Sequence, residues 1–281
     1  YKRIIHPSER PRRKRLATPL LMMPRAATIS KDEGYVIFSP DTFTLQNELV
    51  ETCRQIYKEK VASDEMTSRD PESVKQGMLN SILTAEDLRL NDILVRFALS
   101  DQVLRSVTNY LGEVPRLRNV DIWESPPSKQ TTSEQIKRSQ LFHTDNEDSR
   151  SVRVVVLISD VDENNGPFSF FPAGKTQDII DNLGAQYRAP MGGFVGKPDD
   201  DLIYSVVSRD QLIELKATSG HGAFVDTCRC LHFGSRTRSQ TRIVYMAQFT
   251  SFFDWKTPRP VEFDIENLAT DDLRKAVLGV R

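Results

Sequence analysis

Two histidines and one aspartate indicate a metal site. His143 and Asp145 are separated by one residue, and His232 follows on a much later segment. Residues i and i+2 of a strand point to the same face, so His143 and Asp145 can bind one ion side by side. Two imidazoles and one carboxylate suit Fe(II) and leave about half of an octahedral iron's positions open. We therefore expect these three residues to be the metal ligands of an oxygen-activating enzyme.

Two cysteines offer a competing metal pattern beside the second histidine. Cys228 and Cys230 precede His232, and the three residues could together form a soft-metal cluster. The pattern also predicts a strand over 223–232, whose even positions would share one face. On that strand the cysteines would be small core residues, and His232 would enter the interior of a barrel. We favour this second interpretation.

The first part of the chain is predicted to be helical after a short strand at 35–38. Helical spacing of apolar residues recurs over 42–62, 71–82 and 84–111. We expect the last of these helices to break near Ser100 and to end at Gly112. Cys53 falls on the apolar positions of the first helix, so we interpret it as a core residue.

The later part of the chain is predicted to be rich in strands. Strand patterns cover 119–124, 142–145, 153–158, 168–171, 212–216, 223–232 and 242–249. Residues 164–167 form a turn signal, and a last short helix is expected over 270–278. Helices followed by many strands predict an α+β fold, whose second part is a small antiparallel sandwich or barrel.

Composition places the protein among soluble globular chains. Its 281 residues are 38% hydrophobic, enough for the core of one domain, and its net charge of −1 creates no global attraction for nucleic acid. No apolar run approaches the roughly 20 residues that a membrane span requires. The start is basic rather than an apolar secretory signal, and three cysteines make no disulfide framework. We expect a cytoplasmic protein with no membrane partner.

Residues 1–34 show no clear periodic pattern, and we interpret them as a basic N-terminal arm. The first fifteen residues contain many lysines and arginines, which could contact nucleic acid or an acidic partner. A reader of single strands usually adds stacking aromatic residues, and here the arm contains only Tyr1. We therefore favour a solvated or docked arm. His6 lies in this arm with no assigned role, and His221 is expected to be structural or exposed in a turn.

Several segments resemble one known family. They are Phe-His143-Thr-Asp145, the run from Gly166-Pro167 to Gly174, Gly222–Asp226, His232-Phe-Gly-Ser235 and Arg242. Together they make residues 140–249 similar to the phytanoyl-CoA dioxygenase-like branch of Fe(II)/2-oxoglutarate oxygenases. The resemblance implies a double-stranded β-helix (a jelly roll) with helices packed outside. It implies one domain over 35–281, with a helical part at 41–112 and the jelly-roll core at about 117–250.

The resemblance also implies cofactors and residue roles. His143, Asp145 and His232 would bind Fe(II), while 2-oxoglutarate and O2 would be cosubstrates. Arg242 would grip the far carboxylate of the oxoacid, since a guanidinium fork matches a carboxylate. Arg236 and Arg238 in the preceding turn are competing candidates that we expect to face solvent. Ser235 is a candidate oxoacid contact, although the family often has its serine at the position held here by Gly234.

The implied reaction is hydroxylation of a small molecule with release of succinate and CO2. Asp145 favours oxygenation over halogenation, because related halogenases replace this carboxylate with a small residue. Desaturation, cyclisation and epimerisation stay open. The alternatives are an inactive jelly-roll binding module and an oxygenase that acts on a nucleic acid or other macromolecule. Pocket walls are expected from loops 125–140 and 184–210. The first loop carries three basic residues, Lys129, Lys137 and Arg138.

Overall fold

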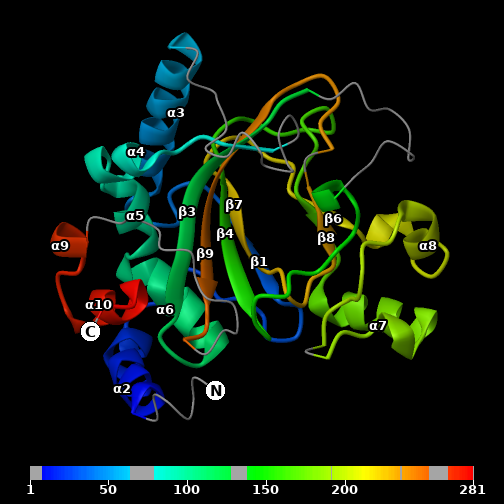
Figure 1. Cartoon of the computed structure of the whole chain (residues 1–281), viewed down its shortest axis with the longest axis horizontal. Coiled ribbons are helices and arrows are strands. Elements are labelled where there is room, and N and C mark those ends of the chain that lie inside the picture. Colours follow the sequence, from blue (N-terminus) through cyan, green and yellow to red (C-terminus); the bar gives the residue numbers. More distant parts are fainter. Residues whose placement is uncertain are drawn as a thin grey trace.

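The protein consists of two antiparallel sheets and a layer of helices. The computed structural model describes residues 8–63, 79–127, 138–190, 192–234, 236–252 and 265–280. The larger sheet lies between the helical layer and the smaller sheet (Figure 1). This arrangement confirms the predicted α+β class. Among the described residues, no helix combines the length and apolar character needed to cross a membrane.

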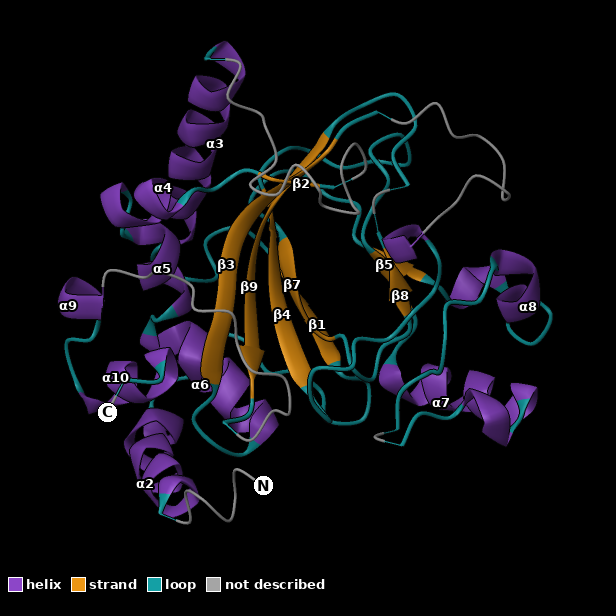
Figure 2. Cartoon of the chain, in the orientation of Figure 1, coloured by secondary structure: helices purple, strands orange, loops and turns teal. Residues whose placement is uncertain are grey.

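The larger sheet has six strands in the order β1-β7-β4-β9-β3-β2. Their bounds are Tyr35–Phe38 (β1), Gly222–Asp226 (β7), Ser151–Leu157 (β4), Arg242–Thr250 (β9), Arg116–Ser125 (β3) and Asn80–Ser81 (β2). The smaller sheet has the order β6-β5-β8, with bounds Ile213–Glu214 (β6), Ser169–Phe170 (β5) and His232–Phe233 (β8). All of the strand pairs are antiparallel (Figure 2).

Most helices flank the outer face of the larger sheet. These are Glu9–Met22 (α2), Gln46–Ala62 (α3), Ala85–Leu90 (α4), Ile93–Ala98 (α5), Asp101–Leu111 (α6), Ile265–Leu268 (α9) and Asp272–Leu278 (α10). Two more lie beyond the smaller sheet, Ala173–Leu183 (α7) and Asp200–Tyr204 (α8). Short 3-10 turns occupy Arg138–Gln140 (η2), Ala185–Tyr187 (η3) and Arg209–Gln211 (η4).

Helix α6 begins and ends where the sequence predicts. The side chain of Ser100 accepts a hydrogen bond from the backbone N–H of Val103, which caps the first turn. Gly112 has a φ of 77°, the left-handed conformation that ends a helix at little cost for glycine. A further break at Asn91 and Asp92, which separates α4 from α5, was not predicted.

Strand β4 is buried on both faces, which explains its continuous β-branched run. Val154 belongs to the core between the sheet and the helices, and Val155 to the core between the two sheets. Cys53 lies in the helix-side core, as predicted. An aromatic cluster continues this core, since the Phe97 ring packs edge-on against Tyr245 of β9 with centroids 5.7 Å apart.

Three predicted elements differ in the structure. The strand expected over 223–232 ends at Asp226, and the chain then turns and enters β8 in the other sheet. Even positions across that segment therefore do not share a face. Residues 142–145 form only an isolated bridge at His143. Of the helix predicted over 71–82, residues 71–78 lie outside the described part of the chain, and Asn80–Ser81 is strand β2.

The helix α2 was not predicted, because its apolar residues lack a clear helical period. Arg13 is only 1% exposed although its neighbours in the sequence are basic and polar. Its guanidinium donates hydrogen bonds to the carbonyl oxygens of Val114, Pro115 and Ala276. This single side chain therefore joins α2 to the α6–β3 connection and to α10. Burial lowers the pKa of Arg13 to about 10.

Replacing Arg13 with Ala is expected to lower the free energy of unfolding by about 2–4 kcal/mol, because three buried carbonyl groups lose their charged donor. Urea denaturation followed by circular dichroism measures the change. Arg10→Ala on the exposed side of the same helix is the matched control, with an expected change within about 0.5 kcal/mol. Equal losses in the two variants would contradict the assigned role.

Candidate metal centre

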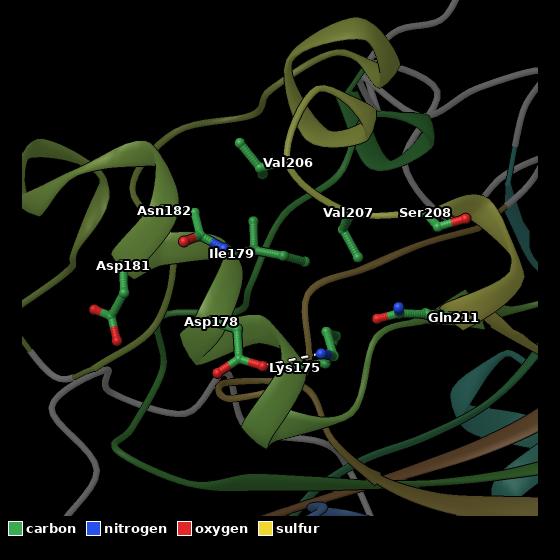
Figure 3. A pocket seen from close by; sticks show the side chains of 9 residues that line it. All are labelled: Lys175, Asp178, Ile179, Asp181, Asn182, Val206, Val207, Ser208 and Gln211. Carbon is green, nitrogen blue, oxygen red and sulfur yellow. Dashed lines mark hydrogen bonds and ion pairs between the residues drawn. The ribbon is translucent and has the colours of Figure 1, made fainter.

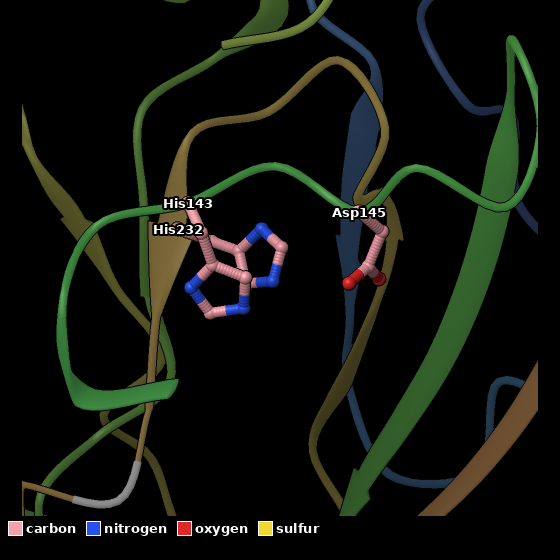
Figure 4. A group of neighbouring side chains, drawn as sticks. All are labelled: His143, Asp145 and His232. Atoms are coloured by element: carbon pink, nitrogen blue, oxygen red, sulfur yellow. The ribbon is translucent and has the colours of Figure 1, made fainter. Parts of the chain in front are cut away.

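The two histidines face each other across a backbone bridge. The N–H of His143 donates to the carbonyl of His232, and the N–H of His232 donates to the carbonyl of His143, both at 2.9 Å. Their ring centroids lie 4.3 Å apart. The bridge joins two segments that are distant in the sequence and holds both imidazoles on one side (Figure 4).

Each imidazole is oriented by a hydrogen bond to a nearby carbonyl. Nδ1 of His143 lies 2.9 Å from the carbonyl oxygen of Leu141, and Nδ1 of His232 lies 2.9 Å from that of Cys230. A carbonyl oxygen can only accept, so the proton of each neutral ring resides on Nδ1. The lone pair on each Nε2 is thereby left for a metal ion, as in other metal-binding histidines.

Asp145 completes the group. Its backbone N–H donates to the carbonyl of Thr227 at 2.8 Å, which fixes the segment after His143. The potential ligand atoms of Asp145, His143 and His232 all lie within 4.8 Å of one another. Figure 4 shows the carboxylate turned toward the two rings. The structure thus brings together the three residues that the sequence singled out.

The environment favours the protonation states that bind metal. Burial and the neighbouring His143 lower the pKa of His232 to about 3. Burial also lowers the pKa of His143. For Asp145 burial acts in the opposite direction, but the positive Arg153 and the two imidazoles lower its pKa well below the usual range. At neutral pH the group therefore consists of two neutral imidazoles and one carboxylate.

A buried aspartate builds the turn between β7 and β8. Oδ1 of Asp226 accepts hydrogen bonds from the backbone N–H groups of Ser151 and Cys228, both at 3.1 Å. Oδ2 accepts the hydroxyl of Tyr110 in α6 at 2.6 Å. The Asp226 carbonyl accepts the N–H of Cys230. This network holds the turn rigidly against the helical layer.

That turn supplies two of the contacts that orient the metal group. The Thr227 carbonyl receives the N–H of Asp145, and the Cys230 carbonyl receives Nδ1–H of His232. Sequence reasoning assigned Asp226 no such role. Burying a carboxylate at the end of an apolar strand costs free energy unless it has hydrogen-bond partners. The position of Asp226 in the sequence could therefore have indicated a structural network.

The cysteines do not join the metal group. Within the described residues, the cluster that could hold an ion contains His143, Asp145 and His232 and neither thiol. Cys230 instead directs its sulfur toward the carbonyl oxygens of Glu33 and Gly34, at 3.6 and 3.8 Å. Burial raises the pKa of both Cys228 and Cys230. The soft-metal cluster is therefore not formed, and the cysteines are core residues of a turn rather than of a strand.

Arg242 lies at the start of β9 on the face that points between the sheets. It is 4% exposed, and its guanidinium donates to the Gly166 carbonyl at 2.6 Å and to the Ser125 hydroxyl at 3.1 Å. Burial lowers its pKa to about 10. A Cβ at Gly234 would lie 3.5 Å from Nη2 of this arginine.

One ring connects this arginine with the histidines. The Phe168 ring lies 5.6 Å from the ring of His232, measured between centroids, and it also borders Gly234. Since Gly234 in turn borders Arg242, the guanidinium is located about one side chain away from the metal group. Its positive charge is buried at this position.

The two competing arginines are placed differently. Arg238 is exposed, as expected. Arg236 is partly buried, and the expectation that it faces solvent is wrong. Its guanidinium pairs with both carboxylate oxygens of Asp200 in α8, at 2.8 and 3.0 Å, and stacks 3.4 Å above the ring of Phe233. These contacts commit Arg236 to holding α8 against the smaller sheet.

His6, Lys129, Lys137 and Ser235 lie outside the described residues, as does the side chain of Arg138. His221 is half-buried in a turn, where Nδ1 lies 3.1 Å from the carbonyl of Thr218. Its predicted structural place agrees with that contact.

A surface groove of about 370 Å³ lies apart from the metal group. Its walls come from α7 and from residues 206–211, as Figure 3 shows. Lys175 and Asp178 form an ion pair at 2.9 Å within it. None of the candidate metal ligands lines this groove, so it is not the site of the expected chemistry.

Comparison with known proteins shows the fold. No family model matches the chain, and no curated protein matches it. EctD from S. alaskensis, solved with 2-oxoglutarate and 5-hydroxyectoine, is similar with a TM-score of 0.55 at 15% identity, covering 84% of this chain and 80% of that one. The non-heme alpha ketoglutarate dependent carbocyclase SnoK from nogalamycin biosynthesis has a TM-score of 0.51 at 14% identity, covering 83% and 85%. HygX from Streptomyces hygroscopicus, with nickel and 2-oxoglutarate bound, has a TM-score of 0.50 at 12% identity, covering 80% and 86%.

Asp226→Asn is expected to remove a pH-dependent part of the stability. Burial raises the pKa of Asp226 from 3.8 to about 6, so its contribution is fully present below pH 3.8 and is lost as the pH rises through 6. Between pH 4 and pH 7 the wild type loses this contribution and the variant does not. The unfolding free energy of the variant relative to that of the wild type should therefore rise by up to about 3 kcal/mol. Urea denaturation of both proteins across this range measures the difference, and a constant difference would contradict it.

Proposed function

We propose that the chain is a non-haem Fe(II)- and 2-oxoglutarate-dependent dioxygenase. The observation that carries this proposal is the convergence of His143, Asp145 and His232 with both Nε2 lone pairs available. Two neutral nitrogens and one carboxylate form the ligand set of oxygen-activating Fe(II) enzymes. The fold shared with EctD, SnoK and HygX supports the same conclusion.

The residues have distinct tasks in the proposed enzyme. His143, Asp145 and His232 hold Fe(II), which supplies the activation of O2 when it is bound. Arg242 receives the far carboxylate of 2-oxoglutarate, because a buried guanidinium fork matches the geometry of a carboxylate. Ser235 remains a candidate for a further contact to the oxoacid.

The proposal extends to the type of fold and to the family of the chain. The two antiparallel sheets are the halves of a double-stranded β-helix whose interior holds the metal group. The chain is a member of the phytanoyl-CoA dioxygenase-like branch. Residues 35–281 form the oxygenase domain, with its helical part at 41–112 and core at about 117–250. Residues 1–34 are a basic arm, and its helix α2 contacts α6 and α10.

A small molecule is the proposed primary substrate. EctD was solved with 5-hydroxyectoine, and SnoK belongs to nogalamycin biosynthesis. The presence of Asp145 favours hydroxylation, with succinate and CO2 as coproducts, and the carbocyclase SnoK is the reason to include ring formation in product analysis. The complete ligand set argues against an inactive binding module.

Anaerobic addition of Fe(II) and 2-oxoglutarate is expected to produce a visible charge-transfer band. His143→Ala and Asp145→Ala should each abolish the band and the release of succinate in air, because each removes one of three ligands. His221→Ala is the matched control, since its ring hydrogen-bonds to Thr218 in its own turn and His221 is not part of the metal group. A band of unchanged intensity in either ligand variant would contradict the assigned centre.

Arg242→Lys is expected to raise the KM for 2-oxoglutarate by about 10- to 100-fold, because lysine keeps the charge but loses the fork that matches a carboxylate. Succinate release at varied 2-oxoglutarate measures the effect. Arg238→Lys, four residues earlier and exposed, serves as the control. An unchanged KM with retained iron binding would exclude Arg242 as the oxoacid contact.

A further inference from the structure

Arg153 forms an ion pair with Asp145 of the metal group, and the sequence did not single it out. It lies in β4 on the face between the sheets, opposite Gln248 of β9. Nε and Nη2 of Arg153 both donate to Oδ2 of Asp145, at 2.9 and 2.7 Å. Both donors thus converge on one oxygen of the carboxylate rather than dividing between the two.

The guanidinium is itself held in place from other sides. Its Nε also lies 3.4 Å from the Thr227 hydroxyl, and Nη1 contacts the Met246 sulfur at 3.1 Å. The side chains of Arg153 and Asp145 are 22% and 11% exposed, so the ion pair is largely removed from water. Charge-assisted hydrogen bonds are strong and directional in such surroundings. Arg153 therefore has little freedom to release Oδ2.

We propose that Arg153 is a positioning residue that restricts Asp145 to binding the metal through one oxygen. The inference rests on the proposed metal centre. Oδ2 is engaged by two N–H donors, whereas Oδ1 takes no part in the ion pair. A carboxylate that bound through both oxygens would occupy a further coordination position. By holding Oδ2, Arg153 keeps that position available for the oxoacid and for O2.

A purely structural ion pair would behave differently. Its loss would lower stability, but it would leave the number of metal positions unchanged. Arginine and lysine separate charge from geometry, because lysine keeps the positive charge without the planar fork. Changing Arg153 to Met removes both properties, whereas changing it to Lys removes only the fork. The ligation state of a bound metal is therefore the measurement that distinguishes the two roles.

Mn(II) is a suitable probe, since it accepts the same octahedral ligands and its EPR line broadens in ¹⁷O-labelled water. The wild type is expected to hold about three exchangeable waters per bound Mn(II), and R153M and R153K about two. If R153M does not fold, R153K alone decides the question. Arg150→Lys is the matched control, because Arg150 contacts Tyr110 and should leave about three waters.

The outcomes separate this inference from the proposed function. A wild-type protein that binds no Mn(II) would overturn the metal centre itself. Mn(II) bound with equal numbers of water in the wild type, R153M and R153K would overturn only the role of Arg153. A loss of one water in both variants, with Arg150→Lys unchanged, would support it.

Discussion

The bridge between His143 and His232 is the constraint on which the metal centre depends. Two reciprocal backbone hydrogen bonds join segments from distant parts of the chain and align the two rings. Each ring is then oriented by a carbonyl two residues earlier in its own segment. The two local hydrogen bonds thus set the tautomer and the direction of each imidazole, and the backbone bridge sets the separation of the two rings. The remaining ligand, Asp145, is fixed by the hydrogen bond from its backbone N–H to the carbonyl of Thr227.

Contacts at the end of strand β7 connect the helical layer with the metal group. Tyr110 in α6 holds Asp226 at the end of β7, and Asp226 shapes the turn whose carbonyls orient Asp145 and His232. Strand β4 contributes on both faces, with Val154 packed against helices and Arg153 against the metal group. The core against the helices and the candidate site therefore lie on opposite faces of the same strand.

The sequence predicted features that depend on neighbouring residues better than features that depend on contacts between distant segments. The spacing of His143 and Asp145 predicted that both residues could bind one ion, and they lie in one group although the expected strand is reduced to a bridge at His143. The single strand predicted over 223–232 was wrong, because the chain leaves the larger sheet after Asp226 and enters the smaller sheet at His232. Tertiary contacts decide this change of sheet, and the apolar pattern does not show it. Arg153 was read as part of a β-branched strand. A charge inside such a run requires a buried partner, and no local rule identifies which partner it finds.

The distance in sequence between the members of the bridge has a consequence for how the protein matures. No contiguous fragment that lacks either His143 or His232 contains the centre, and the turn before His232 also needs α6 in place. Metal affinity therefore requires both the bridge between His143 and His232 and the contact of α6 with this turn to have formed. Binding of the proposed metal ion would favour the folded molecules and add its binding free energy to their stability. Binding of the proposed metal would therefore be coupled to folding rather than independent of it.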